Sequence, residues 1–253
     1  MALRLYHPKR GACIPAIVFF HGGGWVSCGI ETHDNLCRRL ANLSECAVIS
    51  VDYRLSPEAV FPAAIDDACA ALQWVHANAA ELGIDAQRLA VAGDSAGGNL
   101  AAACALLARD PAQNLPRLLH QLLLYPVLDS ACATPSFTTY ANGYLLTGDM
   151  MRWYWQQYVP EPSDRGDARA SPAHAATLAG LPSATLITAE CDPLCDEGAT
   201  YAARLRQAGV QVQLKCWEGV FHGFASMLGM LKAADDAVAM AAAAVRQALS
   251  EQP

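Results

Sequence analysis

Short, almost continuously apolar runs alternate with longer helical patterns along most of the chain. Strands that are apolar on both faces need a cover on both faces, as the strands of a parallel sheet do. Helices that connect such strands produce a doubly wound α/β sheet, so we expect a mostly parallel central sheet with helices on both faces. The runs expected to form strands are Leu3–His7, Ala16–Phe20, Cys46–Val51, Arg88–Ala92, Leu119–Tyr125, Ala184–Ala189 and Gln211–Cys216.

Helical patterns occupy the stretches between these runs. The clearest covers Pro62–Ala80, where proline suits the first turn of a helix and apolar residues recur along one face. Further helices are expected after Ser95, Asp196 and Met227. No internal repeat or linker divides the chain, so we expect a single domain over residues 1–253.

One long segment, residues 129–182, interrupts this alternation. It separates two predicted strands by far more than a crossover helix requires, and it contains an aromatic, helix-like patch over Met150–Tyr158. Insertions at the carboxyl edge of such a sheet often cover an active site. Two interpretations stay open: a cap, or lid, over a site, or a surface helix that packs its aromatic side chains on the core.

Composition and charge exclude several classes of protein. The chain is 53% apolar and 16% charged, which is typical of a globular protein and not of a disordered one. A net charge of −7 argues against nucleic acid or an anionic membrane as the main partner. The sequence shows no secretory signal and no apolar stretch near the roughly 20 residues of a membrane span. We therefore expect a cytoplasmic protein without stable membrane insertion.

The ten cysteines are scattered through predicted strands and helices. A chain of this length needs no disulfides for stability, and Cys191 and Cys195 are one helical turn apart rather than in a CxxC arrangement. We expect small buried apolar residues with no functional thiol. No second Cys/His pair accompanies them, so we expect no metal site.

The segment Gly93–Gly97 reads G-x-S-x-G, a motif that gains weight from its context. The β run Arg88–Ala92 precedes it and a helix of small residues, Gly98–Leu107, follows it. A strand, a sharp turn and a helix in this order are typical of a nucleophile elbow, which predicts Ser95 as the nucleophile. The alternative is a glycine-rich turn in which the serine only caps the helix.

A second glycine-rich motif, His21–Trp25, follows the strand that is expected to end at Phe20. Three consecutive glycines let backbone N–H groups face a substrate oxygen with no side chain in the way. We predict an oxyanion hole made by the N–H groups of Gly22, Gly23 and Ala96. A phosphate-binding loop is the rival interpretation, but neither G-x-G-x-x-G nor G-x-x-x-x-G-K-[ST] is present.

The base should follow the nucleophile if the chain order is serine, acid, histidine. His222 lies in Gly219–Phe224, a glycine-flanked segment directly after the last predicted strand, from which an imidazole could reach Ser95. His21 lies beside the glycine loop and is expected to be structural. The sequence therefore predicts His222 as the base.

The acid should leave the strand before the one that leads to the base. Asp192 comes just after the predicted end of that strand, and Pro193 stiffens the turn. Asp196 is expected to be the N-cap of the next helix, with Glu197 in its first turn, and Glu190 to support the loop. We therefore predict that Asp192 orients the imidazole and stabilises its protonated form.

Taken together, these motifs resemble the hormone-sensitive-lipase-like (bacterial family IV) carboxylesterases of the α/β-hydrolase superfamily. The four motifs that carry the resemblance are His21–Trp25, Gly93–Asn99, Asp192–Leu194 and His222–Phe224. Three shorter phrases support it, namely Asp52–Glu58, Phe61–Ala64 and Ser171–Pro172. The resemblance implies the α/β-hydrolase fold and the same triad and oxyanion donors that the residues themselves predict. Members usually begin with several cap helices, and we expect these to be absent because the first predicted strand starts at Leu3.

The resemblance also implies a serine esterase that hydrolyses short- to medium-chain carboxylic esters through an acyl-enzyme, with no metal or organic cofactor. The expected partners are a small-molecule ester and, in a homodimer, a second copy of the chain. A related acyl hydrolase acting on an amide, a lactone or an acetylated substrate is the nearer alternative. A non-catalytic ligand-binding protein of this fold is the more distant one, and the retained His222 argues against it.

Overall fold

The computed structural model of the chain describes residues 1–9 and 11–250. These residues form one seven-stranded sheet of order β1-β3-β2-β4-β5-β6-β7, in which β1 is antiparallel to β3 and all other pairs are parallel. The predicted mostly parallel sheet is thus confirmed. The strands are β1 Ala2–Tyr6, β2 Ile14–Phe20, β3 Ala47–Asp52, β4 Ile84–Asp94, β5 His120–Leu124, β6 Ser183–Cys191 and β7 Val212–Phe221.

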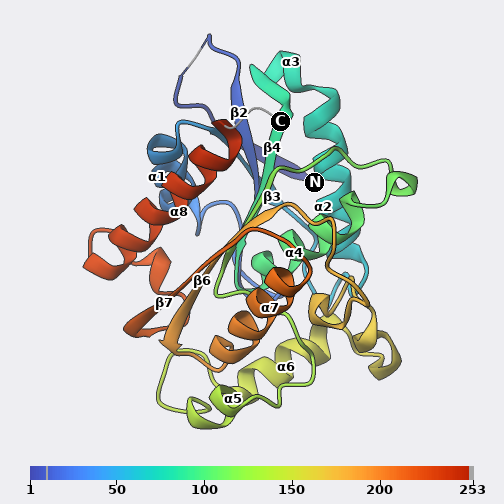
Figure 1. Cartoon of the computed structure of the whole chain (residues 1–253). Coiled ribbons are helices and arrows are strands. Elements are labelled where there is room, and N and C mark those ends of the chain that lie inside the picture. The colour runs from blue at the N-terminus through green and yellow to red at the C-terminus, as the bar shows by residue number, and fades with distance from the viewer. Residues whose placement is uncertain (10, 251–253) are drawn as a thin grey trace.

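Helices cover both faces of this sheet (Figure 1). Helices α1 and α8 pack on one face, whereas α2, α4 and α7 pack on the other. None of the helices in the described residues is long and apolar enough to cross a membrane. The α-helices are α1 Asp34–Ser44, α2 Ala63–Ala77, α3 Ala79–Leu82, α4 Ala96–Ala108, α5 Pro135–Thr139, α6 Gly148–Tyr158, α7 Cys195–Gln207 and α8 Lys232–Ser250.

Strand β2 shows why the predicted strands are apolar almost without interruption. Side chains of consecutive strand residues point to opposite faces of a sheet. In β2, Ile17 and Phe19 lie in the core layer beneath α1 and α8, while Val18 and Phe20 lie in the layer beneath α2 and α4. All four are fully buried, so neither face of the strand tolerates a polar side chain.

Some predicted boundaries were wrong. Helix α2 ends at Ala77 because the Asn78 side-chain amide and backbone N–H both donate to carbonyls of its last turn, and a separate helix, α3, follows. Strands β4 and β7 extend beyond the predicted runs, to Ile84 and Phe221. Helix α1 was not predicted, and its N-cap residue, His33, makes no side-chain capping hydrogen bond.

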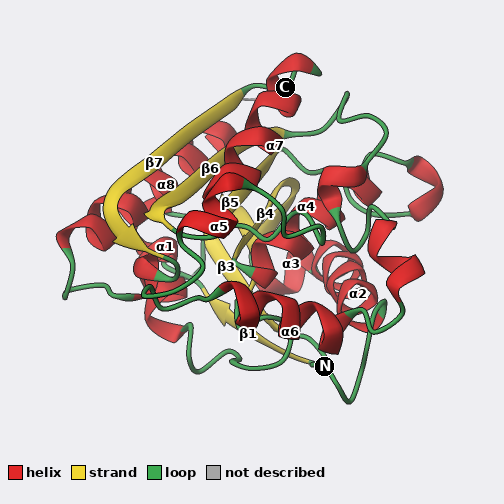
Figure 2. Ribbon diagram, turned by 90° about the horizontal axis from the view of Figure 1, so that it is seen from below, coloured by secondary structure: helices red, strands yellow, loops and turns green. Residues whose placement is uncertain are grey.

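The carboxyl ends of the central strands meet at one edge of the sheet. Phe20 pairs with Gly93, and Asp94 pairs with Leu124, so β2, β4 and β5 end side by side. Helices α5 and α6, from residues 129–182, lie beyond this edge at the bottom of Figure 1. They are also in front of the strands in Figure 2, where the molecule is seen from below. A parallel sheet places side chains from several loops at this edge.

The expectation of buried cysteines holds only in part. Cys37, Cys46 and Cys104 are buried, whereas Cys13, Cys28 and Cys216 are exposed and the other four are intermediate. The exposed cysteines lie in loops or on the edge strand β7, which helices cover less completely than the central strands. All ten cysteines are free thiols in the structure.

Candidate active site

Ser95 occupies the turn between β4 and α4 with φ 55° and ψ −119°, a conformation rarely adopted by a residue with a side chain. Its N–H donates to the carbonyl of Leu124 at 2.9 Å, which joins the turn to β5. The turn is so tight that a Cβ on Gly93 would lie 2.2 Å from the Gly97 carbonyl carbon and oxygen. A Cβ on Gly97 would lie 1.9 Å from the Phe20 carbonyl oxygen. The predicted nucleophile elbow is therefore present.

Gly97→Ala should destabilise the fold strongly. The added methyl meets the backbone of β2, which cannot move aside as a side chain could, so we expect a loss of about 3 kcal/mol or more. For a chain of this size, that corresponds to a fall in Tm of roughly 6–12 °C. Thermal unfolding measures it, with Gly166→Ala as control because a Cβ there meets nothing within 4 Å. An unchanged Tm in Gly97→Ala would contradict the packing described.

His222 and Asp192 lie in line with the Ser95 hydroxyl. His222 Nε2 is 2.8 Å from Ser95 Oγ, and His222 Nδ1 is 2.7 Å from Asp192 Oδ2. Asp192 directly follows β6 and His222 directly follows β7, so two neighbouring strands deliver them, as predicted. The structure thus brings the three predicted residues together although 127 positions separate Ser95 from His222.

The hydrogen bonds around Asp192 determine which nitrogen of His222 donates and which accepts. Its carboxylate is fully buried, and Oδ1 accepts the Leu194 N–H at 2.9 Å while Oδ2 faces the imidazole. The imidazole therefore donates through Nδ1 and leaves the Nε2 lone pair free for the Ser95 hydroxyl. The ring of Tyr125 packs beside His222 with centroids 4.8 Å apart, which further limits how the imidazole can rotate.

The loop after β2 needs all three of its glycines. A Cβ on Gly23 would lie 2.2 Å from the Ser27 carbonyl oxygen, and one on Gly24 would lie 2.2 Å from the Tyr154 ring. Both residues have positive φ, of 106° and 61°. Among the described residues, the N–H groups of Gly23, Gly24 and Ala96 have no hydrogen-bond partner.

The prediction of Gly22 as an oxyanion donor was wrong. Its N–H donates to Asp94 Oδ1 at 2.9 Å and is therefore not available to a substrate. A Cβ at Gly22 would lie 2.5 Å from the other oxygen of the same carboxylate, so this glycine allows the loop to approach Asp94. The sequence did not indicate this contact, because 72 residues separate the two groups.

Two histidines near this loop belong to its support. The ring of His21 stacks on Tyr53 at 4.3 Å between centroids, its Nδ1 is bonded to the Gly22 carbonyl, and burial lowers its pKa. His21 is thus structural, as predicted. His33 makes an ion pair with Asp94, with 3.1 Å between Nε2 and Oδ1. Sequence reasoning missed this pair, although a carboxylate at the buried end of β4 was a signal that a cationic partner was needed.

The acid loop also has neighbours that the sequence did not reveal. Asp196 is not an N-cap: it lies inside the first turn of α7, and its Oδ2 accepts the Ser136 N–H from α5 at 2.7 Å. Glu190 accepts the Gly219 N–H at 2.7 Å and so supports the loop, as expected. Glu197 is buried, and its carboxyl accepts the Leu128 N–H; burial raises its pKa well above the ordinary value.

Helix α6 packs directly on the glycine loop. Trp25 is fully buried and stacks on Tyr158 at 4.3 Å between ring centroids, with Trp155 at 4.9 Å. Tyr154 lies against Gly24, and the Phe61 N–H donates to the Tyr158 carbonyl. The aromatic patch that the sequence singled out is therefore in contact with the predicted oxyanion loop.

The structure has a serine on a strained strand-to-helix turn at the carboxyl edge of a parallel sheet, and a histidine and a buried aspartate lie in line with it. This arrangement defines the class of α/β-hydrolases. The family described as "alpha/beta hydrolase fold" matches residues 17–226. The chain is 43% identical to an ethyl acetate hydrolase of Pseudomonas putida, over 98% of this chain and 79% of the relative. It is 45% identical to carboxylesterase NlhH of Mycobacterium tuberculosis, over 93% of this chain and 74% of the relative.

A solved structure agrees with these relatives. A thermophilic carboxylesterase cloned from a metagenomic library superimposes with a TM-score of 0.94 at 44% identity, over 99% of this chain and 85% of that one. The chain belongs to the α/β-hydrolase family and, within it, to the hormone-sensitive-lipase-like (bacterial family IV) carboxylesterases. The resemblance in its motifs is thereby confirmed.

Proposed function

We propose that this chain hydrolyses short- to medium-chain carboxylic esters, with Ser95 as nucleophile, His222 as general base and Asp192 as orienting acid. The observation that carries the proposal is the continuous chain of hydrogen bonds, 2.8 and 2.7 Å long, from the Ser95 hydroxyl through His222 to Asp192. The names of the esterase relatives support the class of reaction.

In the first step, Ser95 Oγ attacks the ester carbonyl carbon while its proton passes to His222 Nε2. The Nδ1–H bond to Asp192 then stabilises the imidazolium. The carbonyl oxygen becomes an oxyanion, for which the free N–H groups of Gly23 and Ala96 are the proposed donors, with Gly24 beside them. The N-terminus of α4 also lies under Ser95 and favours negative charge there.

Collapse of this intermediate breaks the bond to the alcohol, which leaves with the proton from His222 Nε2. A water molecule then attacks the acyl group on Ser95 and gives its proton to His222, which returns that proton to Ser95 as the carboxylic acid departs. Each step uses the same hydrogen-bonded chain, so removing any one of the three side chains should affect both halves of the reaction.

We further propose that residues 129–182 form a cap over the site within a single domain. Its two helices are anchored on opposite sides of Ser95. Helix α6 packs on the oxyanion loop through Trp155 and Tyr158, whereas α5 binds the acid loop through Ser136. Leu145, between the two helices, is 64% exposed and would lie 3.8 Å from a Cβ on Gly223, next to the base.

A panel of p-nitrophenyl esters with acyl chains of 2 to 12 carbons tests the function. We expect kcat/KM to be highest among short chains, in keeping with the relative named for ethyl acetate, and to gain little beyond hexanoyl. Acetanilide and a γ-lactone serve as amide and lactone controls. Faster turnover of either control than of every ester would contradict an esterase and favour the related acyl hydrolases. A cytoplasmic location and a homodimer stay predictions.

A further inference from the structure

Three segments of the chain meet at the carboxylate of Asp94, the residue directly before the proposed nucleophile. Asp94 Oδ1 accepts the Gly22 N–H from the loop after β2 at 2.9 Å and faces His33 Nε2, at the start of α1, at 3.1 Å. The side chains of Asp94 and His33 are each only 6% exposed. One oxygen atom therefore connects the oxyanion loop to the end of β4, the strand that leads to Ser95.

The contacts around His33 favour its protonated form. The Thr32 hydroxyl donates to the Gly29 carbonyl at 2.8 Å, so it can only accept from His33 Nδ1, which lies 2.9 Å away. The ionised Asp94 has no proton to donate, so it accepts from His33 Nε2. The Gly22 N–H also lies 3.4 Å from His33 Nε2, but its shorter bond, of 2.9 Å, is to Asp94 Oδ1. Together these contacts fit an imidazolium ring, with a proton on each nitrogen.

The electrostatics agree with this assignment. Burial lowers the pKa of His33, but the charge of Asp94 and the hydrogen bond to it outweigh burial and raise that pKa above its ordinary value. For Asp94, burial alone would raise the pKa. The charge of His33, the hydrogen bond to it and the Gly22 N–H outweigh burial, so the pKa of Asp94 is lowered. A buried ion pair of this kind is costly unless both partners are present.

We propose that the His33–Asp94 ion pair positions the oxyanion loop, by holding the Gly22 peptide so that the neighbouring Gly23 N–H faces the substrate oxygen together with that of Ala96. His33 and Asp94 are thus positioning residues, and this inference rests on the proposed function. Oxyanion donors act only within about 2.7–3.1 Å of the oxygen, so a small shift of the loop is enough to slow catalysis.

Few other groups near His33 titrate in the range where it would lose its proton. The centroids of the His21 and His33 rings are 5.6 Å apart, and burial lowers the pKa of His21, which favours its neutral form. Burial raises the pKa of the Cys37 thiol, one turn along α1, to about 12. Two further carboxylates lie around this cluster: Asp34, bonded to Arg4, Tyr6 and Arg38, and Asp52, whose charge acts on His21.

The pair predicts an alkaline fall in activity. Because the pKa of His33 is raised, the ion pair is intact below that pKa and is lost as the pH rises through it. The kcat for a butanoyl ester should therefore fall on the alkaline side. In His33→Gln, an uncharged amide donates to Asp94 at every pH, so the variant imitates the uncharged form of His33. We expect this variant to have at pH 7 the lowered kcat that the wild type reaches on the alkaline side, and to show no alkaline fall of its own.

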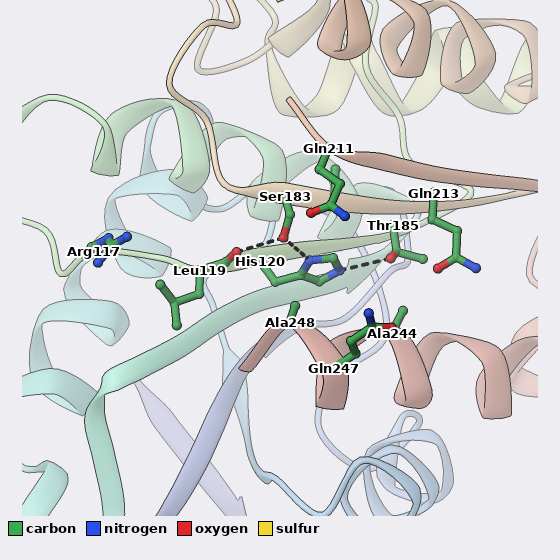
Figure 3. Close-up of a pocket in the computed structure, with 11 residues that line it drawn as sticks. Arg117, Leu119, His120, Ser183, Thr185, Gln211, Gln213, Ala244, Gln247 and Ala248 are labelled. Carbon is green, nitrogen blue, oxygen red and sulfur yellow. Dashed lines mark hydrogen bonds between the residues drawn. The ribbon is translucent and has the colours of Figure 1, made fainter. Parts of the chain in front are cut away.

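His33→Leu removes the donor altogether. We expect kcat to drop about 10- to 100-fold with KM changed less than threefold, because charge on the substrate oxygen develops only in the transition state. A butyl trifluoromethyl ketone, which forms a tetrahedral adduct with an oxyanion, should lose affinity in parallel with kcat/KM. His120→Gln is the matched control. That histidine is buried at the opposite edge of the sheet between Ser183 and Thr185, with no carboxylate partner (Figure 3).

His120→Gln should lower Tm while leaving kcat and the ketone affinity within twofold. The inference is overturned if His33→Leu, shown to be folded by circular dichroism, also keeps both within twofold. It is equally overturned if His33→Gln keeps the alkaline fall. If His33→Leu does not fold, the pH profiles of kcat for the wild type and for His33→Gln still test the inference. Hydrolysis that persists in Ser95→Ala would instead refute the proposed function, so the two failures are distinguishable.

Discussion

Ser95→Ala should reduce kcat by a factor on the order of 10⁶, because the nucleophile is lost while substrate binding and the oxyanion donors remain. The alanine methyl replaces only a hydroxyl at the turn, so the fold should be retained. Hydrolysis of p-nitrophenyl butanoate measures the loss. A fluorophosphonate should add a single phosphonyl group to the wild-type chain, and peptide mass spectrometry should locate it in the segment that contains Ser95.

The same reagent provides the control for this prediction. Ser95→Ala should take up no phosphonyl group at all. Ser183 also has a histidine beside it, with 2.7 Å between its Oγ and His120 Nδ1, but this histidine has no carboxylate partner, so Ser183 should not react in either protein. Labelling of equal extent in Ser95→Ala would mean that another residue is the nucleophile.

Asp192→Asn should reduce kcat about 10³- to 10⁴-fold with little loss of fold. The amide can present an N–H to the imidazole, which then holds its proton on Nε2 and can no longer accept the proton of Ser95. The oxygen of the amide can still accept the Leu194 N–H, so the loop keeps its shape. Steady-state kinetics on the butanoyl ester, with circular dichroism as a check of folding, measure the effect.

Asp196→Asn is the matched control, because this carboxylate lies four residues further on and is bonded to Ser136 instead of to His222. We expect its kcat to stay within a few-fold of the wild type and its stability to fall by at most about 1 kcal/mol, because the amide oxygen can still accept the Ser136 N–H but lacks the carboxylate charge that strengthens this bond. The opposite pattern, with Asp196→Asn inactive and Asp192→Asn active, would reassign the acid.

Most of this site could be predicted from the sequence because its reactive residues follow the ends of strands. Ser95 and Asp192 follow closely on the predicted apolar runs Arg88–Ala92 and Ala184–Ala189, and parallel strands end at one edge of a sheet. His222 lies further from its predicted run, Gln211–Cys216, and the glycines on either side of it were the signal there. The runs and the glycine motifs together were therefore enough to bring the three residues to one edge of the sheet. The apolar runs likewise indicated the mostly parallel sheet, since its inner strands are largely buried on both faces, whereas the edge strands β1 and β7 are partly exposed.

Contacts between loops could not be predicted in this way. The Gly22 N–H bonds to the Asp94 carboxylate instead of facing the substrate, and His33 pairs with the same carboxylate. Asp196 binds Ser136 and does not cap α7, because α5 folds back onto the acid loop. Both hydrogen bonds join segments that are more than 50 residues apart in the sequence, and local sequence patterns carry no information about such contacts.

The close packing around the elbow has a consequence for how such an enzyme can change during evolution. Side chains cannot be added at Gly93 or Gly97 without meeting backbone atoms, so the floor of the site cannot be reshaped by single substitutions there. The exposed positions of residues 129–182, such as Leu145 and Trp153, carry no such restriction and should tolerate many side chains. New substrates should therefore be acquired by variation in this segment, while the catalytic floor is inherited unchanged.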